Sequence, residues 1–295
     1  MGLSLLFTGD NAHARMHLDR AIALYDAAEH RSLATGIDVD TGVSVFSFRS
    51  LALWMLGYPE AAVADAEQAI KEAREIGDVA TLMYALTIPT WTHVHCGNYD
   101  AAKMRSDEAM ALADEKGALF WKATGMVIQG CVLTLSGEAS NAVSIISSGL
   151  VAYRSTGTTI WVPLHLAYLA RAFANLGQFD EAWRCIGESM AAIEATNEKW
   201  CEAHVYRVAG EIALMPPEHD EARAEQYFTH ALVIARAQQA RSWELRAATS
   251  LARLWHDQRK LGEARDLLAP VYGWFTEGFD TPDLKEAKVL LDELA

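Results

Sequence analysis

The sequence predicts an all-α protein, a right-handed α-solenoid of about seven helix–turn–helix repeats. Three observations predict this class. Small residues recur about every 40 positions, glycines recur at the same spacing, and no segment alternates apolar and polar residues as a strand would. Only 7 of the 295 residues are prolines, which suits long helices.

The repeated small residues mark the second helix of each repeat, helix B. Each is followed seven positions later by a small or apolar pair, and the repeat centres are Ala14, Ala62, Ala102, Ala142, Ala182, Ala224 and Ala264. A tiny side chain lets two helices approach closely, whereas a large one would force them apart. We therefore expect a single domain over residues 1–295, with a capping helix over residues 283–294.

Two series of glycines predict the turns. The first series, Gly57, Gly97, Gly137 and Gly177, follows apolar helical stretches and precedes acidic residues. Glycine is favoured just after a helix, and an acid is favoured in the first turn of the next one. The second series, Gly77, Gly117 and Gly157, is expected to end helix B. Each repeat then consists of helix A, a tight turn, helix B and a looser turn.

The turns carry a resemblance to a known family. The stretches 96–102 (CGNYDAA) and 176–182 (LGQFDEA) resemble the turn of a tetratricopeptide repeat. That family repeats every 34 residues or so, and this chain repeats at 40, so longer helices are expected. Residues 198–202, 210–214, 237–246 and 268–281 also resemble the C-terminal helical region of bacterial proteins that join a class III adenylate or guanylate cyclase domain to an ATPase domain.

This second resemblance implies the sensor or protein-interaction region of a bacterial signalling regulator. The sequence contains no phosphate-loop motif and no segment typical of a cyclase domain. The resemblance therefore transfers no catalysis, and we predict that the chain is not an enzyme.

Composition excludes several classes of partner. The chain has 25 Lys and Arg against 39 Asp and Glu, a formal net charge of −14, which argues against nucleic acid and anionic membranes. The four cysteines fit no zinc or redox spacing, so we expect reduced core thiols in a cytoplasmic protein. His13 and His17 stand four residues apart but have no third ligand at a known spacing. We predict no metal and no cofactor.

Tryptophan is frequent, and four of the nine recur near the start of helix A: Trp121, Trp161, Trp200 and Trp243. Two interpretations remain open. The rings could fill packing positions between repeats, because large aromatic side chains dominate core energetics. They could instead line the concave surface, which in tetratricopeptide-like solenoids is formed by helix A.

Alignment to the family's turn implies which helix A residues face that groove. They are Trp54, Tyr84, Trp91, His95, Trp121, Trp161, Arg171, Asn175, His204, Arg207, Glu211, Trp243, Arg246 and Arg253. Aromatic side chains mixed with a few convergent polar groups are typical of recognition surfaces. The arginines, in an otherwise acidic chain, favour an acidic ligand or a C-terminal carboxylate.

We therefore predict a non-catalytic binding or scaffold module that recognises a protein or peptide, or else a small ligand, in this groove. One alternative is an enzyme or small-molecule-binding protein that closes the solenoid into a pocket. Another is a structural unit that self-associates. A homodimer through the terminal repeats fits the apolar N-terminus, where Leu3, Leu5 and Phe7 make a poor cap.

Overall fold

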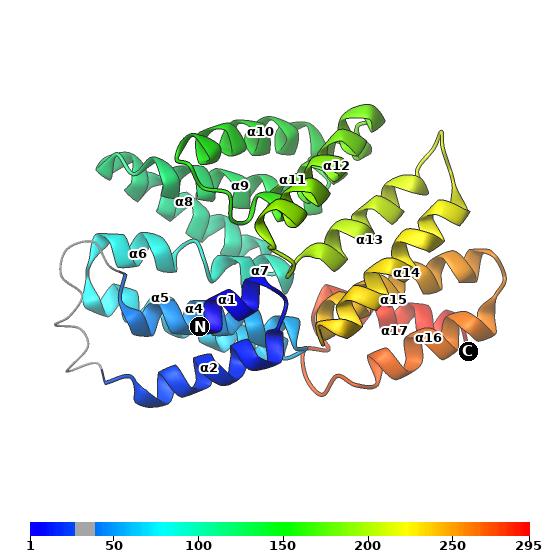
Figure 1. The fold of residues 1–295 in the computed structure, drawn as a ribbon, viewed down its shortest axis with the longest axis horizontal. Coiled ribbons are helices and arrows are strands. Elements are labelled where there is room, and N and C mark those ends of the chain that lie inside the picture. Colours follow the sequence, from blue (N-terminus) through cyan, green and yellow to red (C-terminus); the bar gives the residue numbers. More distant parts are fainter. Residues whose placement is uncertain (27–38) are drawn as a thin grey trace. The chain divides into compact units, whose positions relative to one another are not determined.

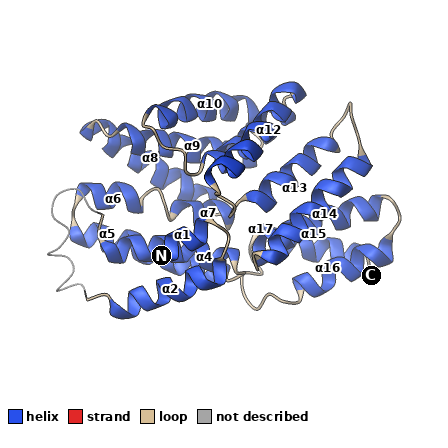
Figure 2. Cartoon of the chain, in the orientation of Figure 1, coloured by secondary structure: helices blue, strands red, loops and turns tan. Residues whose placement is uncertain are grey.

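The computed structural model describes residues 1–26 and 39–295, and every regular element within them is a helix (Figure 2). The chain forms two compact units. Unit 1 contains Met1–Leu6, Ala12–Trp54 and Pro59–Thr159, and unit 2 contains Phe7–Asn11, Met55–Tyr58 and Ile160–Ala295. The expectation of a single domain over residues 1–295 stays a prediction.

Unit 1 holds most of the first helices of the chain. They are α1 (Gly2–Phe7), α2 (Asn11–Leu24), α4 (Thr41–Met55), α5 (Pro59–Ile76), α6 (Val79–Ala85), α7 (Thr90–His95), α8 (Tyr99–Lys116), α9 (Leu119–Leu135) and α10 (Ala139–Ser155). Helix α5 packs against α6 and α7, α8 packs against α7 and α9, and α9 packs against α10. Consecutive helices are thus neighbours, as expected of stacked helix–turn–helix repeats.

One helix A of unit 1 is divided in two. The repeat that carries Tyr84, Trp91 and His95 has α6, four turn residues and then α7. Pro89 explains the break. Proline has no N–H to donate to a carbonyl four residues earlier, and it disfavours a helical conformation at the residue before it.

Unit 2 is a regular two-layered stack. Its helices are α11 (Val162–Asn175), α12 (Phe179–Thr196), α13 (Glu202–Ala213), α14 (Glu221–Ala237), α15 (Arg241–Asp257), α16 (Leu261–Tyr272) and α17 (Pro282–Glu293). Helices α11, α13, α15 and α17 pack in that order and form the helix A layer (Figure 1). Helices α12, α14 and α16, the helix B layer, each pack against the A helix before them.

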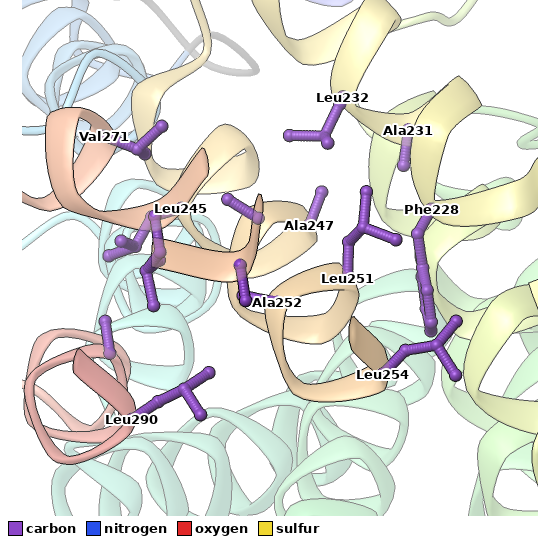
Figure 3. Packing of buried hydrophobic residues seen from close by; sticks show 14 of the residues in the cluster. Phe228, Ala231, Leu232, Leu245, Ala247, Leu251, Ala252, Leu254, Val271 and Leu290 are labelled. Carbon is purple, nitrogen blue, oxygen red and sulfur yellow. The ribbon is translucent and has the colours of Figure 1, made fainter. Parts of the chain in front are cut away.

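The seven alanines that mark helix B are all buried, each with 0% exposure. Two of them, Ala224 and Ala264, belong to a core of unit 2 that also holds Phe228 of α14, Leu251 of α15 and Leu290 of α17 (Figure 3). Larger side chains at the alanine positions would separate the layers. The regular spacing of these alanines in the sequence therefore reflects the close packing between helices.

The glycine series also has its expected role. Gly97 and Gly177 have φ values of 80° and 73°, in the left-handed region that glycine adopts without strain. Such a residue ends a helix and turns the chain toward the next one. The predicted all-α, tetratricopeptide-like repeat fold is confirmed.

The four cysteines are free and buried, as expected. None of the helices in the described ranges has both the length and the apolar character needed to cross a membrane. Nor do three or more His, Cys, Asp or Glu side chains gather there in a way that would hold a metal ion.

Candidate functional site

The arginines predicted for the groove meet on the helix A layer of unit 2. Arg171 lies on α11, Arg207 and Glu211 lie one turn apart on α13, and Arg246 lies on α15. Residues four apart share one face of a helix, so Arg207 and Glu211 point the same way. Packing of neighbouring A helices then brings the side chains together.

Glu211 is shared between two arginines. Arg207 Nη1 binds its Oε1 atom, and Arg171 Nη1 lies 3.9 Å from its Oε2 atom. Farther along the same layer, Arg246 of α15 donates a hydrogen bond from Nε to Oδ2 of Asp283 on α17, at 2.8 Å. These contacts define the arginine cluster, which holds three guanidinium groups and two carboxylates. Its residues are Arg171, Arg207, Glu211, Arg246 and Asp283.

Burial and mutual charge govern the cluster. Burial lowers the pKa of Arg207, and Arg171 and Arg246 lower it further against the opposing effect of Glu211. Burial raises the pKa of Glu211, but the three arginines outweigh it and leave that pKa below its usual value. The cluster therefore brings three guanidinium groups close together in a partly buried setting, where charge interacts more strongly than in water.

Arg207 sits deepest. Its side chain is 9% exposed, whereas those of Arg171 and Arg246 are 31% and 14% exposed. Within the described ranges its buried Nε atom has no hydrogen-bond partner. Arg171 and Arg246 are therefore the more accessible guanidinium groups of the cluster.

Aromatic rings support the cluster from beneath. His204 stacks on Trp243 with centroids 4.7 Å apart, and the Arg246 guanidinium lies 5.1 Å from the centre of the Trp243 ring. Tyr168 also contacts His204, at 5.2 Å between ring centroids. A guanidinium held against an indole ring keeps a fixed orientation.

Three other predicted residues of unit 2 lie apart from these. Arg253 is half exposed and pairs with Glu286 at 2.6 Å. Asn175 is exposed at the end of α11. Trp161, at the other end of α11, is buried beside Trp200 with ring centroids 4.9 Å apart.

The predicted residues of unit 1 form two aromatic groups. Trp54 stacks on His95 with centroids 4.3 Å apart, and Trp91 lies 6.2 Å from the same histidine. These three side chains are buried. Tyr84 and Trp121, both half buried, meet edge to face at 5.8 Å.

Sequence reasoning missed two carboxylates of unit 2. Asp283 was assigned only to a capping helix, although α17 continues the helix A layer and carries it to Arg246. Glu198 is 2% exposed and accepts hydrogen bonds from the Trp161 backbone and the Trp200 indole. The repeat register predicts Asp283, but no sequence pattern predicts Glu198.

Comparison with known proteins supports the fold alone. No family model matches the chain, and no curated protein matches it. Among solved structures, the apo form of RapI has a TM-score of 0.62 at 14% identity, over 99% of each chain.

Two further solved structures are similar. A Rap protein complexed with Competence and Sporulation Factor has a TM-score of 0.60 at 13% identity, over 90% of this chain and 76% of the other. Aspartyl phosphate phosphatase F from Bacillus subtilis has a TM-score of 0.59 at 11% identity, over 96% of this chain and 69% of the other.

Proposed function

We propose that this chain is a non-catalytic binding module that recognises a protein or peptide through a carboxylate. The ligand binds the arginine cluster on the helix A layer of unit 2. One observation carries the proposal: three buried or half-buried guanidinium groups gather around Glu211 and Asp283, in a chain whose net charge is −14. Arginine binds carboxylates in a bidentate geometry that lysine cannot provide.

The ligand's carboxylate supplies negative charge to the three guanidinium groups of the cluster. This carboxylate lies between Arg171 and Arg246, which are the more exposed members of the cluster. Arg207 stays bound to Glu211 and contributes its charge at close range. Association of an acidic partner with this site is favoured over that of a basic one, because the wrong charge is repelled.

The similar structures support a role in recognition. One of them is a Rap protein in complex with Competence and Sporulation Factor, which shows that this kind of helical fold accepts a ligand. The resemblance to cyclase–ATPase proteins adds a place in bacterial cytoplasmic signalling to the proposal.

The test uses fluorescence polarisation with a set of labelled peptides that differ in the number of acidic residues and in a free or amidated C-terminus. We expect peptides with more carboxylates to bind more tightly. Replacing both Arg171 and Arg246 by glutamine weakens that binding about tenfold or more, since each loses a charge-assisted hydrogen bond.

Arg253→Gln is the matched control, because Arg253 lies on the same layer but pairs at the surface with Glu286. It should leave the affinity within about twofold of the unchanged protein. The proposal is wrong if acidic and neutral peptides bind alike, or if the double variant binds as well as the control.

A further inference from the structure

A short segment near the start of the chain packs as part of unit 2. Phe7–Asn11 belongs to this unit, although the residues before and after it belong to unit 1. The Phe7 carbonyl accepts hydrogen bonds from the backbone N–H groups of Lys199 and Trp200, at 2.7 and 3.2 Å. The Asn11 side chain donates to the Gln238 carbonyl at 3.0 Å. The segment thus spans the turns before α13 and α15.

The Phe7 side chain enters an aromatic pocket. Its ring meets Trp161 edge to face, with centroids 5.8 Å apart and planes at 84°. It meets Trp200 in the same way at 6.5 Å and 80°. Edge-to-face contact is a preferred geometry between aromatic rings.

The pocket is held in place by groups other than Phe7. Trp161 has φ = 69°, a conformation that side-chain-bearing residues rarely adopt. Both carboxylate oxygens of Glu198 accept from its N–H, at 2.9 and 3.0 Å, and the Trp200 indole donates to the same carboxylate at 2.8 Å. Glu198 therefore holds both tryptophans through contacts that do not involve Phe7.

The resident segment fits this surface imperfectly. Asn11 Oδ1 and Gln238 Oε1 are buried and have no hydrogen-bond partner within the described ranges. Gly9 has φ = 87° and approaches Gln238 closely. A Cβ atom there would lie 2.7 Å from Gln238 Nε2, so a larger residue at this position would push the segment away. Unsatisfied buried acceptors weaken docking, so a segment that satisfies them would compete well.

We propose that Trp161, Trp200, Glu198 and the backbone of Lys199 and Gln238 form a binding site for an extended peptide with an aromatic side chain, and that Phe7–Asn11 is its displaceable resident. An incoming peptide places its ring against both tryptophans, as Phe7 does, and accepts hydrogen bonds from the Lys199 and Trp200 N–H groups. The tethered resident competes at high effective concentration, so the unchanged protein binds such a peptide weakly. The site shares no residue with the arginine cluster and stands independently of the function proposed above.

The test uses two synthetic peptides with blocked ends. One has the sequence of residues 5–12, LLFTGDNA, and the other has alanine in place of its phenylalanine. Binding to the full-length Phe7→Ala variant is measured by fluorescence polarisation. We expect the phenylalanine peptide to bind about tenfold more tightly than the alanine peptide, from two aromatic pairs. It should also bind this variant more tightly than it binds the unchanged protein.

Equal affinities of the two peptides for a folded Phe7→Ala variant would overturn the proposal. Phe279→Ala is the matched control, because it removes a half-exposed ring of unit 2 that lies outside the pocket. This variant should bind the peptides as weakly as the unchanged protein does. A peptide-insensitive dimer of the unchanged protein would show instead that the site takes the segment of a second copy.

A second variant covers the case in which Phe7→Ala does not fold. Gly9→Ala loosens the resident segment and leaves the pocket whole, so it should raise the affinity for the phenylalanine peptide several-fold. Gly262→Ala is its control, since a Cβ atom there meets nothing within 4 Å. The proposal fails if Gly9→Ala and Gly262→Ala bind the peptide alike. Adding Glu198→Gln to Gly9→Ala should abolish the gain.

Discussion

Arg105 in unit 1 and Arg207 in unit 2 are both buried, with side chains 7% and 9% exposed, but they differ in their neighbours. Arg105 pairs with one carboxylate, Glu67, at 2.6 Å, and that side chain is 53% exposed. Beside it, His93 stays neutral at pH 7, because burial first and Arg105 second lower its pKa to about 4. Arg105 and Glu67 thus form a pair of one positive and one negative charge.

Arg207 instead belongs to a cluster with more guanidinium groups than carboxylates. Each arginine also has one buried nitrogen without a hydrogen-bond partner in the described ranges, Nη1 in Arg105 and Nε in Arg207. Burial alone therefore does not distinguish a structural arginine from a ligand-binding one. The local charge balance differs between the two, and our proposal that unit 2 binds the ligand rests on that difference.

The largest effect is expected from Glu211→Gln. This change removes the carboxylate shared by Arg207 and Arg171 and leaves Arg207 buried without its ion pair. We expect a loss of about 3 kcal/mol in the free energy of unfolding, measured by urea denaturation. Glu67→Gln in unit 1 should lose less, because Glu67 is half exposed.

Glu286→Gln is the control for both, since it breaks only the exposed pair with Arg253 and should change stability by less than about 1 kcal/mol. Equal losses for Glu211→Gln and Glu286→Gln would mean that the cluster carries no more electrostatic energy than a surface pair.

The buried carboxylates of the two units should also differ in how they make stability depend on pH. Asp65 of unit 1 is paired with Arg49 at 2.6 Å, whereas Glu198 of unit 2 is held by N–H donors, and burial raises its pKa to about 7. The folded protein then binds a proton more readily than the unfolded chain, so stability falls as pH rises from 4.5 to about 7. The loss attributable to Glu198 is up to about 3 kcal/mol.

Urea denaturation across this pH range measures that effect. In Glu198→Gln the Glu198 contribution is absent, so the curve should be flatter by that amount. Identical pH dependence in the two proteins would show that Glu198 is ionised with an ordinary pKa in the folded state.

Packing should be equivalent in the two units even though their charges differ. A Cβ atom at Gly130 of unit 1 would overlap Ile146, and one at Gly210 of unit 2 would overlap Phe228. Alanine at either position should lower stability by about 1–3 kcal/mol through overpacking. Gly187 of α12 has nothing within 4 Å, so Gly187→Ala should raise stability by about 0.5–1 kcal/mol.

Thermal unfolding of the three alanine variants measures this. A neutral Gly130→Ala or Gly210→Ala would show that neighbouring helices move apart at little cost, which contradicts close packing as the reason for the repeated small residues.

The smallest effect concerns His93. Because Arg105 lowers its pKa, Arg105→Gln should raise that pKa from about 4 toward the ordinary histidine value, although burial keeps it depressed. Glu67→Gln should move it in the opposite direction. An NMR titration of the imidazole resonances measures both shifts, and a His93 pKa that is the same in both variants would remove the proposed electrostatic contact.

The helical repeat was predictable because it depends on steric size at fixed spacing. Ala62 and Ala182 had to be small for helix B to pack, and Gly97 and Gly177 had to turn the chain. The division between α6 and α7 was missed, although Pro89 carries a local signal for it.

The arginine cluster was partly predictable and the aromatic pocket was not. Helical register placed Arg171, Arg207 and Arg246 on one layer, because that layer repeats with the sequence period. The docking of Phe7 against Trp161 and Trp200 joins residues more than 150 positions apart and follows no period. Such contacts depend on tertiary structure, which no local pattern encodes.

The central claim is that a carboxylate ligand binds Arg171 and Arg246. The most direct test follows the arginine side-chain N–H resonances by NMR while the tightest-binding acidic peptide of the set is added. The account predicts that the Nε–H resonances of Arg171 and Arg246 shift together along the binding curve, while that of Arg253 stays in place. Saturable binding that moves the Arg253 resonance and leaves those of Arg171 and Arg246 unchanged would contradict it.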